Sequence, residues 1–348
     1  MPNTDTSPLQ PFVSVLMPVY NAGSFIGEAI YSLLGQTYPF FEIILIDDHS
    51  TDHSVEIIGS FNDPRIRLFR NDRNMGITAS LNKGLSLAQH ELIARMDADD
   101  ICHPLRLEKQ VAYMMAHPDC AMVSTWVRII NEEGQYIRTE GTRQQYLYYN
   151  LFFECCIYHP TIMLRKTLLE KAGNYRLPYA EDFELFQRIS RQFRIGGIDE
   201  PLLDYRVHHA NTNTVGRKTE YDDFSLRILK GNIRYCLGDK APVPPLAYLE
   251  CYRYNHRLLT ATPGLKKIYD CLDQLDKISA AILQIPNPNN RSKDILFIWR
   301  FKKDYIIRQL SAYLSPLQKI RLGFKYRKFS LVIPYKLRRA ISLLINRT

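Results

Sequence analysis

The sequence contains no run of about 18 apolar residues free of charge, so it offers no candidate for a membrane-spanning helix. Its first 12 residues are polar and include prolines, unlike the basic and then apolar start of a secretory signal peptide. The seven cysteines form no C-x-x-C pair, which argues against a zinc site. We therefore expect a soluble, cytoplasmic chain whose thiols are reduced.

Internal repeats and low-complexity stretches are also absent, which excludes solenoid and fibrous architectures. The 348 residues are 46% hydrophobic and 23% charged, a balance that supports a well-buried core and excludes disorder. At about 100–200 residues per domain, the length predicts two domains, or one large domain with an appendage.

Positive charge is unevenly distributed along the chain. The net charge is +9, but residues 291–348 alone contain 15 Lys and Arg against two Asp, so the preceding part is slightly acidic. Such asymmetry predicts an anionic partner for the C-terminal tail, either nucleic acid or a membrane surface.

Strand-like and helix-like patterns alternate over the first 130 residues. Short apolar runs predict strands at 13–18, 41–46, 65–70 and 91–96, and helical periodicity predicts helices at 24–36, 52–60, 77–89 and 104–116. This alternation is typical of an α/β fold with a mostly parallel sheet between two layers of helices. Ligands bind such sheets beyond the carboxyl ends of the strands.

The pattern then becomes less regular. We expect a hairpin at 121–130 and 135–139, a strand at 159–164, helices at 166–172 and 181–193, and a helical chain beyond 211. Pro-rich breaks at 241–245 and 285–290 divide the helical part. The predicted organisation is an α/β domain at 11–215, a helical region at 216–290 and a basic amphipathic tail at 291–348.

Polar clusters follow three of the predicted strands: Tyr20-Asn21, Asp47-Asp48-His49-Ser50 and Asp97-Ala98-Asp99-Asp100. Neighbouring carboxylates repel, and a divalent cation with diphosphate oxygens would explain the third cluster. The alternative is a solvated acidic turn before the next helix. In the second cluster, Asp48 is suited to accept an N–H from a nucleobase, whereas Ser50 or Asp52 is suited to cap the following helix.

Ordered motifs connect these clusters to a known family. They are Pro18-Val19-Tyr20-Asn21-Ala22, Ile46-Asp47-Asp48-His49-Ser50-Thr51-Asp52, Arg73-Asn74-Met75-Gly76, Met96-Asp97-Ala98-Asp99-Asp100, Gly173-Asn174-Tyr175-Arg176 followed by Glu181-Asp182, and Tyr205-Arg206-Val207-His208. Together they resemble the nucleotide-sugar half of the family 2 glycosyltransferases, which have the Rossmann-like GT-A fold. The resemblance covers residues 11–215 and does not extend to the C-terminal third.

The resemblance implies a role for each matching residue. Pro18, Val19 and Tyr20 would line the nucleobase and ribose, Asp48 would accept the base N3–H, and Arg73 would lie near the base or phosphates. Asp97 would approach the ribose or the water shell of the metal, and Asp99 and His208 would bind Mn²⁺ or Mg²⁺. Asp182 would be the catalytic base. His49 departs from the family, where Gly or Asn is common.

These roles are chemically consistent with one reaction. An acceptor hydroxyl needs a carboxylate within hydrogen-bond reach to attack the anomeric carbon, and a cation stabilises the leaving nucleoside diphosphate. A base and a metal-held leaving group on opposite sides imply inversion. The competing interpretation of Asp182 is a carboxylate at the first turn of a helix, where the dipole favours it.

Two other functions compete with this interpretation of the motifs. A sugar-phosphate nucleotidyltransferase would need a basic phosphate loop after the first strand, and residues 20–23 contain no basic side chain. A binding module without catalysis is disfavoured because Asp99 and Asp182 are both present. The expected partners are a nucleotide-sugar donor, most simply a UDP-sugar, and a glycan or lipid-linked acceptor.

The tail interleaves Lys and Arg with bulky apolar residues, for example at 298–303, 324–329 and 331–344. This pattern predicts amphipathic helices at an anionic membrane surface, which would place the enzyme on the inner face of the cell membrane. Nucleic acid would not require so many apolar residues, so no nucleic-acid partner is expected. The alternative is a helical subdomain that buries its apolar face and exposes a basic one.

Overall fold

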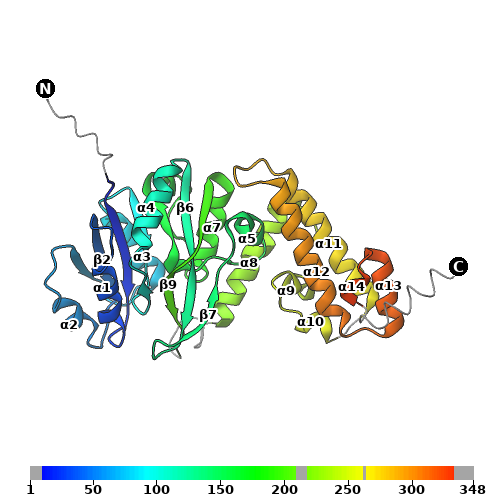
Figure 1. The fold of residues 1–348 in the computed structure, drawn as a ribbon, viewed down its shortest axis with the longest axis horizontal. Helices are drawn as coiled ribbons and strands as arrows, with labels where there is room; N and C mark the ends of the chain where they lie inside the picture. The colour runs from blue at the N-terminus through cyan, green and yellow to red at the C-terminus, as the bar shows by residue number, and fades with distance from the viewer. Residues whose placement is uncertain (1–9, 209–217, 262–263, 333–348) are drawn as a thin grey trace, which may run out of the picture. The chain divides into compact units, whose positions relative to one another are not determined.

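The computed structural model describes residues 10–208, 218–261 and 264–332 (Figure 1). The described residues form two compact units. The first contains residues up to 151, together with 155–225 and 287–289, and the second contains 152–154, 226–286 and the residues from 290 onward.

Four parallel strands form one half of the sheet in the first unit. They are β1 (Val13–Val19), β2 (Phe41–Asp47), β3 (Ile66–Arg70) and β4 (Leu92–Arg95), in the order β3-β2-β1-β4. Every residue of β1 and β2 is buried, as continuous apolar runs between two helical layers require. The predicted strands and the parallel sheet are confirmed here.

Helices cover both faces of this half-sheet. The intervening helices are α1 (Ile26–Leu34), α2 (Ser54–Gly59), α3 (Ile77–Leu87) and α4 (Arg106–Ala116). The odd-numbered residues of β1 share a buried core with α1 and α4, whereas Leu16 contacts Gly84 of α3 so closely that a Cβ there would lie 1.9 Å from Leu16 Cδ1. Because successive side chains of a strand point to opposite faces, α3 lies on the other face and the predicted three layers are confirmed.

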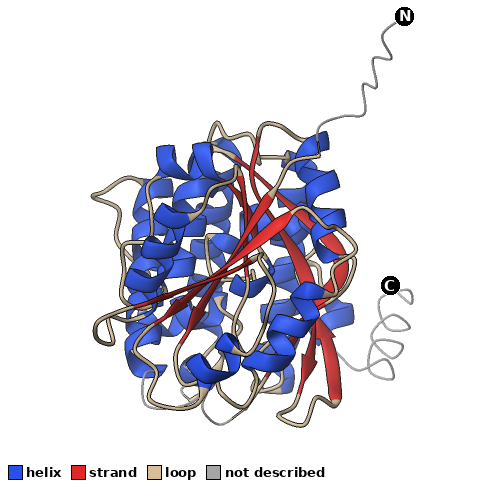
Figure 2. Cartoon of the chain, turned by 90° about the vertical axis from the view of Figure 1, so that its left-hand side faces the viewer, coloured by secondary structure: helices blue, strands red, loops and turns tan. Residues whose placement is uncertain are grey.

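The other half of the sheet is mixed. Its strands are β8 (Met163–Arg165), β6 (Cys120–Ile130), β9 (Arg194–Arg206) and β5 (Ile101–Cys102), with β7 (Tyr136–Glu140) paired to β6. β8 is antiparallel to both β4 and β6, and β6 is parallel to β9. Figure 2 shows how strongly these strands twist. The predicted hairpin is confirmed as β6 and β7.

Two features of this half differ from the sequence prediction. The expected strand at 159–164 begins instead with a 3-10 turn, His159–Thr161, and only Met163–Arg165 is extended. The sequence analysis also missed β9, whose Gly196, Gly197 and Pro201 are poor strand formers. Gly196 is required because a Cβ there would lie 2.4 Å from the Tyr113 hydroxyl of α4.

Three further helices belong to the first unit: α5 (Leu147–Leu151), α6 (Lys166–Ala172) and α7 (Glu181–Gln192), preceded by the 3-10 turn Gln144–Tyr146. Helix α8 (Lys218–Leu237) begins in the first unit and ends in the second. The remaining helices are α9 (Leu246–Tyr252), α10 (Arg257–Thr260), α11 (Leu265–Gln284), α12 (Ser292–Ser311), α13 (Pro316–Tyr326) and α14 (Phe329–Val332).

The second unit has an apolar core of its own. α11 buries a stripe that includes Ile268, Leu272 and Leu275, spaced at helical intervals. α12 buries Ile295, Ile298, Ile306, Ile307 and Leu310 in the same unit, so this part of the basic tail packs its apolar face within the protein. None of the helices within the described residues combines the length and apolar character needed to cross a membrane.

Candidate active site

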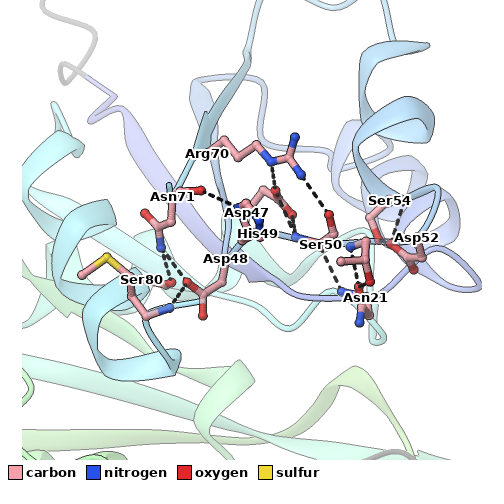
Figure 3. Close-up of polar contacts among 12 residues, drawn as sticks. Asn21, Asp47, Asp48, His49, Ser50, Asp52, Ser54, Arg70, Asn71 and Ser80 are labelled. Carbon is pink, nitrogen blue, oxygen red and sulfur yellow. Dashed lines mark hydrogen bonds and ion pairs between the residues drawn. The ribbon is translucent and has the colours of Figure 1, made fainter. Parts of the chain in front are cut away.

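The loops that follow β1 and β2 are joined by hydrogen bonds between backbone and side chains (Figure 3). The backbone N–H of Asn21 donates to Ser50 Oγ at 3.0 Å, and Asn21 Oδ1 accepts from the Thr51 backbone at 2.9 Å. Gly23 N donates to Asp52 Oδ2 at 2.8 Å, an approach that leaves no room for a Cβ. The two strand ends therefore form one preorganised edge, where a parallel α/β sheet binds its ligands.

Asp47 and Asp52 hold this edge together. Asp47 is fully buried, accepts from Ser50 N and pairs with Arg70 Nε at 3.0 Å. Asp52 Oδ1 accepts from the backbone N–H of Ser54, the first residue of α2, at 3.0 Å. The N-cap position of α2 is His53, whose side chain makes no capping hydrogen bond, so neither of the predicted residues, Ser50 or Asp52, is the cap. Asp52 instead closes the turn that precedes the helix, and Ser50 is engaged with the β1 loop.

Asp48 is only 4% exposed and accepts three hydrogen bonds. Its Oδ1 accepts from Asn71 Nδ2 at 2.7 Å and from Met75 N at 2.8 Å, and its Oδ2 accepts from Gly76 N at 2.8 Å. The carboxylate thereby anchors the loop between β3 and α3. His49 follows with a φ of 66°, so histidine adopts the left-handed turn that glycine or asparagine favours.

The other residues predicted to contact the nucleotide lie at the same edge. Pro18 and Val19 are buried at the end of β1, and Tyr20 directly after them is 52% exposed. The backbone N–H of Asp48 donates to Val19 O at 2.8 Å, which fixes the two strand ends side by side. Arg73 is exposed on the loop that Asp48 anchors.

The turn after β4 gathers three carboxylates. One oxygen from each of Asp97, Asp99 and Asp100 lies within 4.8 Å of the others. Asp100 is 1% exposed, and its Oδ2 has no hydrogen-bond partner among the described residues. An unpartnered buried carboxylate oxygen is costly, and a cation would satisfy it. These residues therefore fit an oxygen-preferring divalent cation.

Two buried arginines support this turn, and the sequence analysis assigned a role to neither. Arg95, the last residue of β4, is 4% exposed and donates to Asp97 Oδ2 at 2.5 Å. Arg206, at the end of β9, donates through Nε to Asp99 O at 2.9 Å and through its backbone N–H to Asp100 Oδ1 at 3.0 Å. A charged residue within an otherwise apolar strand was the only sequence signal for Arg95.

His208 extends from β9 to the same turn. Its Nε2 lies 2.9 Å from Asp99 Oδ2, and its ring packs against Phe25 with a centroid separation of 4.9 Å. The structure thus brings Asp97, Asp99 and His208 together, as the sequence analysis expected, across more than 100 residues of chain.

Asp182 is the second residue of α7. The residue before this helix, Ala180, has a left-handed φ of 52°. Asp182 Oδ1 accepts from Phe183 N at 2.7 Å, and the Cys155 thiol donates to Oδ2 at 3.6 Å. Burial raises the pKa of Asp182, although the hydrogen bond from Phe183 and the charge of Arg95 oppose the shift. The predicted base is therefore a partly buried carboxylate of increased basicity.

The neighbouring Glu181 is also largely enclosed, with 13% of its side chain exposed. Burial, followed by the charge of Asp182, raises the pKa of Glu181 to about 8. Buried His159 lies beside it, with Nδ1 3.7 Å from Glu181 Oε1 and Nε2 2.8 Å from the Tyr175 hydroxyl. The raised pKa therefore favours the protonated form of Glu181 at neutral pH.

The acidic turn after β4 and the Glu181–Asp182 pair act on each other electrostatically. Burial raises the pKa of Asp97 to about 6, Arg95 opposes the shift, and the charges of Asp99 and Asp182 add to it. Burial and the charges of Asp99 and Asp97 likewise raise the pKa of Asp100. A single site therefore combines three carboxylates suited to a cation with a partly buried carboxylate of raised pKa.

Sequence comparison identifies related enzymes. The sequence model of the glycosyl transferase family 2 matches residues 14–173. An uncharacterized glycosyltransferase of Haemophilus influenzae is 31% identical over 284 residues, covering 76% of this chain and 87% of the relative. The O-antigen biosynthesis glycosyltransferase WbnJ of Escherichia coli is 33% identical over 217 residues, covering 58% of this chain and 81% of its own.

Structure comparison supports the fold. The crystal structure of residues 1–349 of S. aureus TarS in complex with UDP-GlcNAc has a TM-score of 0.54 and 17% sequence identity. The similarity covers 90% of this chain and 92% of that one. The two acidic turns of this chain thus lie at the ligand-binding edge of a GT-A sheet, and the chain belongs to glycosyltransferase family 2.

Proposed function

We propose that this protein transfers a sugar from a UDP-sugar to the hydroxyl of a glycan acceptor, with inversion at the anomeric carbon. The observation that carries the proposal is the meeting of two carboxylate groups with different chemistry. Asp97, Asp99 and Asp100 bring carboxylate oxygens within 4.8 Å of one another, and Asp100 Oδ2 is buried without a partner among the described residues. Asp182 lies close enough for its charge to raise the pKa of Asp97.

The nucleotide would bind at the joined ends of β1 and β2. Tyr20 offers an exposed ring for the base, Asp48 offers a carboxylate oxygen to the base N–H, and Arg73 offers positive charge to the phosphates. TarS, which shares the fold, is described in complexes with UDP-GlcNAc and with UDP, and this supports a uridine nucleotide here.

Asp99 and His208 would hold Mn²⁺ or Mg²⁺, with Asp100 and Asp97 beside them. Such a cation, when bound, neutralises negative charge that develops on the leaving diphosphate. Arg206 holds Asp99 and Asp100 in position through its two hydrogen bonds to the turn. Arg95 limits the repulsion among the carboxylates because its guanidinium is buried against Asp97.

Asp182 would accept the proton of the acceptor hydroxyl. As the hydroxyl oxygen bonds to the anomeric carbon, the bond from that carbon to the diphosphate oxygen breaks, and the electron pair leaves with UDP. Attack from the face opposite to the leaving group inverts the configuration. Glu181, which retains its proton, leaves Asp182 as the only base of the pair.

The acceptor would be a cell-surface glycan precursor on a lipid carrier. Among the relatives are WbnJ of O-antigen biosynthesis and TuaG, a putative teichuronic acid glycosyltransferase of Bacillus subtilis, which is 29% identical over 209 residues. A lipid carrier would require the enzyme at the cytoplasmic face of the membrane. The exposed side of α12, with Phe301 at 53% exposure beside Arg300, supports contact with anionic lipid rather than nucleic acid.

The proposal is tested by incubating the purified protein with common nucleotide sugars and measuring nucleoside diphosphate release, with and without Mn²⁺. Metal-dependent release of UDP from one donor is the expected result. Release of pyrophosphate from a nucleoside triphosphate and a sugar phosphate would instead show a nucleotidyltransferase. Binding of a nucleotide sugar without turnover on any glycan acceptor would show a binding module.

A further inference from the structure

Asn71 is a buried amide at the end of β3, inside the polar network of Figure 3. Its Nδ2 donates to Asp48 Oδ1 at 2.7 Å and to Ser80 Oγ at 3.0 Å. Its Oδ1 accepts from Lys83 Nζ at 2.8 Å. Both amide hydrogens and the amide oxygen therefore have partners, and the side chain has one favourable orientation.

The opposite orientation of the amide is unfavourable on both sides. A flip would turn the amide oxygen toward the Asp48 carboxylate and the amide hydrogens toward the Lys83 ammonium group. Lys83 is itself held by a second hydrogen bond, from Nζ to Arg70 O at 2.9 Å. The charge of Lys83 thus fixes Asn71, and Asn71 in turn fixes Asp48.

The two oxygens of Asp48 are consequently unequal. Oδ1 accepts from Asn71 Nδ2 and Met75 N, which fills both of its lone-pair directions. Among the described residues, Oδ2 accepts only from Gly76 N, so it retains the capacity for one further donor. The carboxylate offers a single acceptor position and cannot rotate without breaking three hydrogen bonds.

We propose that Asn71 is a positioning residue for nucleobase selection, and that it orients Asp48 so that Oδ2 accepts the N3–H of uracil and rejects cytosine. This inference rests on the proposed use of a uridine donor. Uracil presents an N–H at N3, whereas cytosine presents a lone pair there, which repels a carboxylate oxygen. A carboxylate free to rotate could reach the N4 amino group of cytosine instead, and one held by Asn71 cannot.

The experiment measures the dissociation constants of UDP and CDP by calorimetry in the presence of Mn²⁺. Asn71→Ala is expected to lower the preference for UDP over CDP by about tenfold, mainly through weaker UDP binding. Lys83→Met, which leaves the contact between Asn71 and Asp48 in place, is expected to change the preference in the same direction by about two- to threefold. Ser86→Ala removes an exposed hydroxyl elsewhere on α3 and is the control.

The apparent affinity for Mn²⁺ and the melting temperature are measured for each variant. A general loss of structure would weaken the binding of UDP and of CDP equally and would also change the affinity for Mn²⁺. If both Asn71→Ala and Lys83→Met gave this result, the inference would be overturned. An unchanged UDP to CDP ratio in a folded Asn71→Ala protein would overturn it as well, while the proposed function would stand. Failure of the unaltered protein to bind UDP would overturn the proposed function itself.

Discussion

Two acidic clusters at the same edge of the sheet are built in opposite ways. The β2 cluster, Asp47, Asp48 and Asp52, accepts hydrogen bonds from several internal donors, and the hydrogen bonds to Asp52 outweigh its burial and lower its pKa. The β4 cluster, Asp97, Asp99 and Asp100, has few donors, raised pKa values at Asp97 and Asp100, and one buried oxygen without a partner. The charges of the first cluster are satisfied by internal donors, with one acceptor position left at Asp48 Oδ2, whereas the second cluster has an excess of negative charge that a cation would balance.

The largest expected effect is that of replacing Asp182, the proposed base. Asp182→Asn should reduce transfer by about 10²–10⁴-fold, the usual contribution of a positioned base, and leave donor binding intact because the amide keeps the shape of the carboxylate. Steady-state transfer and UDP calorimetry measure the two quantities. The matched control is Glu181→Gln, which should retain most activity. Near-native turnover of Asp182→Asn would show that another residue is the base, and Glu181 would be the next candidate.

Removal of a carboxylate from the β4 cluster should abolish the effect of metal. In Asp99→Ala, Mn²⁺ should no longer strengthen UDP binding, because the turn loses a ligand and the partner of His208. Calorimetry with and without Mn²⁺ gives the comparison, and Asp63→Ala, outside the site, is the control. Unchanged metal-dependent affinity would place the cation at other residues.

Stability in EDTA should separate the two clusters directly. Asp48→Ala should lower the free energy of unfolding by about 2–4 kcal/mol, because three donors lose their acceptor. Asp100→Asn should be neutral or stabilising, since it removes a repelled charge and keeps an oxygen for the Arg206 backbone. Urea denaturation measures both, and equal losses in the two variants would contradict the contrast.

The pH dependence of stability should report Glu181. Below about pH 4.5 the residue is protonated in both states, and between that value and its folded pKa of about 8 only the folded state holds the proton. Stability in EDTA should therefore fall as pH rises through this window, by up to about 5 kcal/mol from this group, since the pKa rises from 4.5 to about 8 on folding and one pKa unit is worth about 1.4 kcal/mol. Glu181→Gln should show a flatter profile by urea denaturation, and identical profiles would refute the assignment.

The smallest expected effect is on membrane contact. The double variant Arg300→Ser with Phe301→Ser should lower co-sedimentation with anionic vesicles at low salt by about tenfold, as lost charge and lost apolar contact combine. Raised salt should weaken binding of the unaltered protein, because attraction is screened over about 8–10 Å. Point variants are preferable to deletion of residues 291–348, since α12 buries Lys302, Ile306 and Ile307 within its unit.

Tyr31→Ser provides the control for this test, since Tyr31 is a 70% exposed aromatic residue of the first unit. Equal sedimentation of the double variant and the control would end the membrane proposal. Tighter binding of the unaltered protein to nucleic acid than to anionic vesicles would do the same.

The sequence alone determined the half of the fold in which periodicity and burial coincide. β1 and β2 are uninterrupted apolar runs, and a strand between two helical layers needs no other signal. Asp97, Asp99 and Asp182 were identifiable because carboxylates at the end of a strand or the start of a helix are conspicuous in a sequence. The family resemblance supplied their expected roles.

Only the tertiary structure decided which groups surround those carboxylates. Arg206 lies 106 residues from Asp100, and Asn71 lies 23 residues from Asp48, and no local pattern encodes either hydrogen bond. β9 could not be predicted because glycine and proline are poor strand formers. They are tolerated in this strand through its pairing with β6 and the close contact with Tyr113. Local sequence specifies the elements and the reactive side chains, whereas their pKa values and orientations depend on burial and on partners distant along the chain.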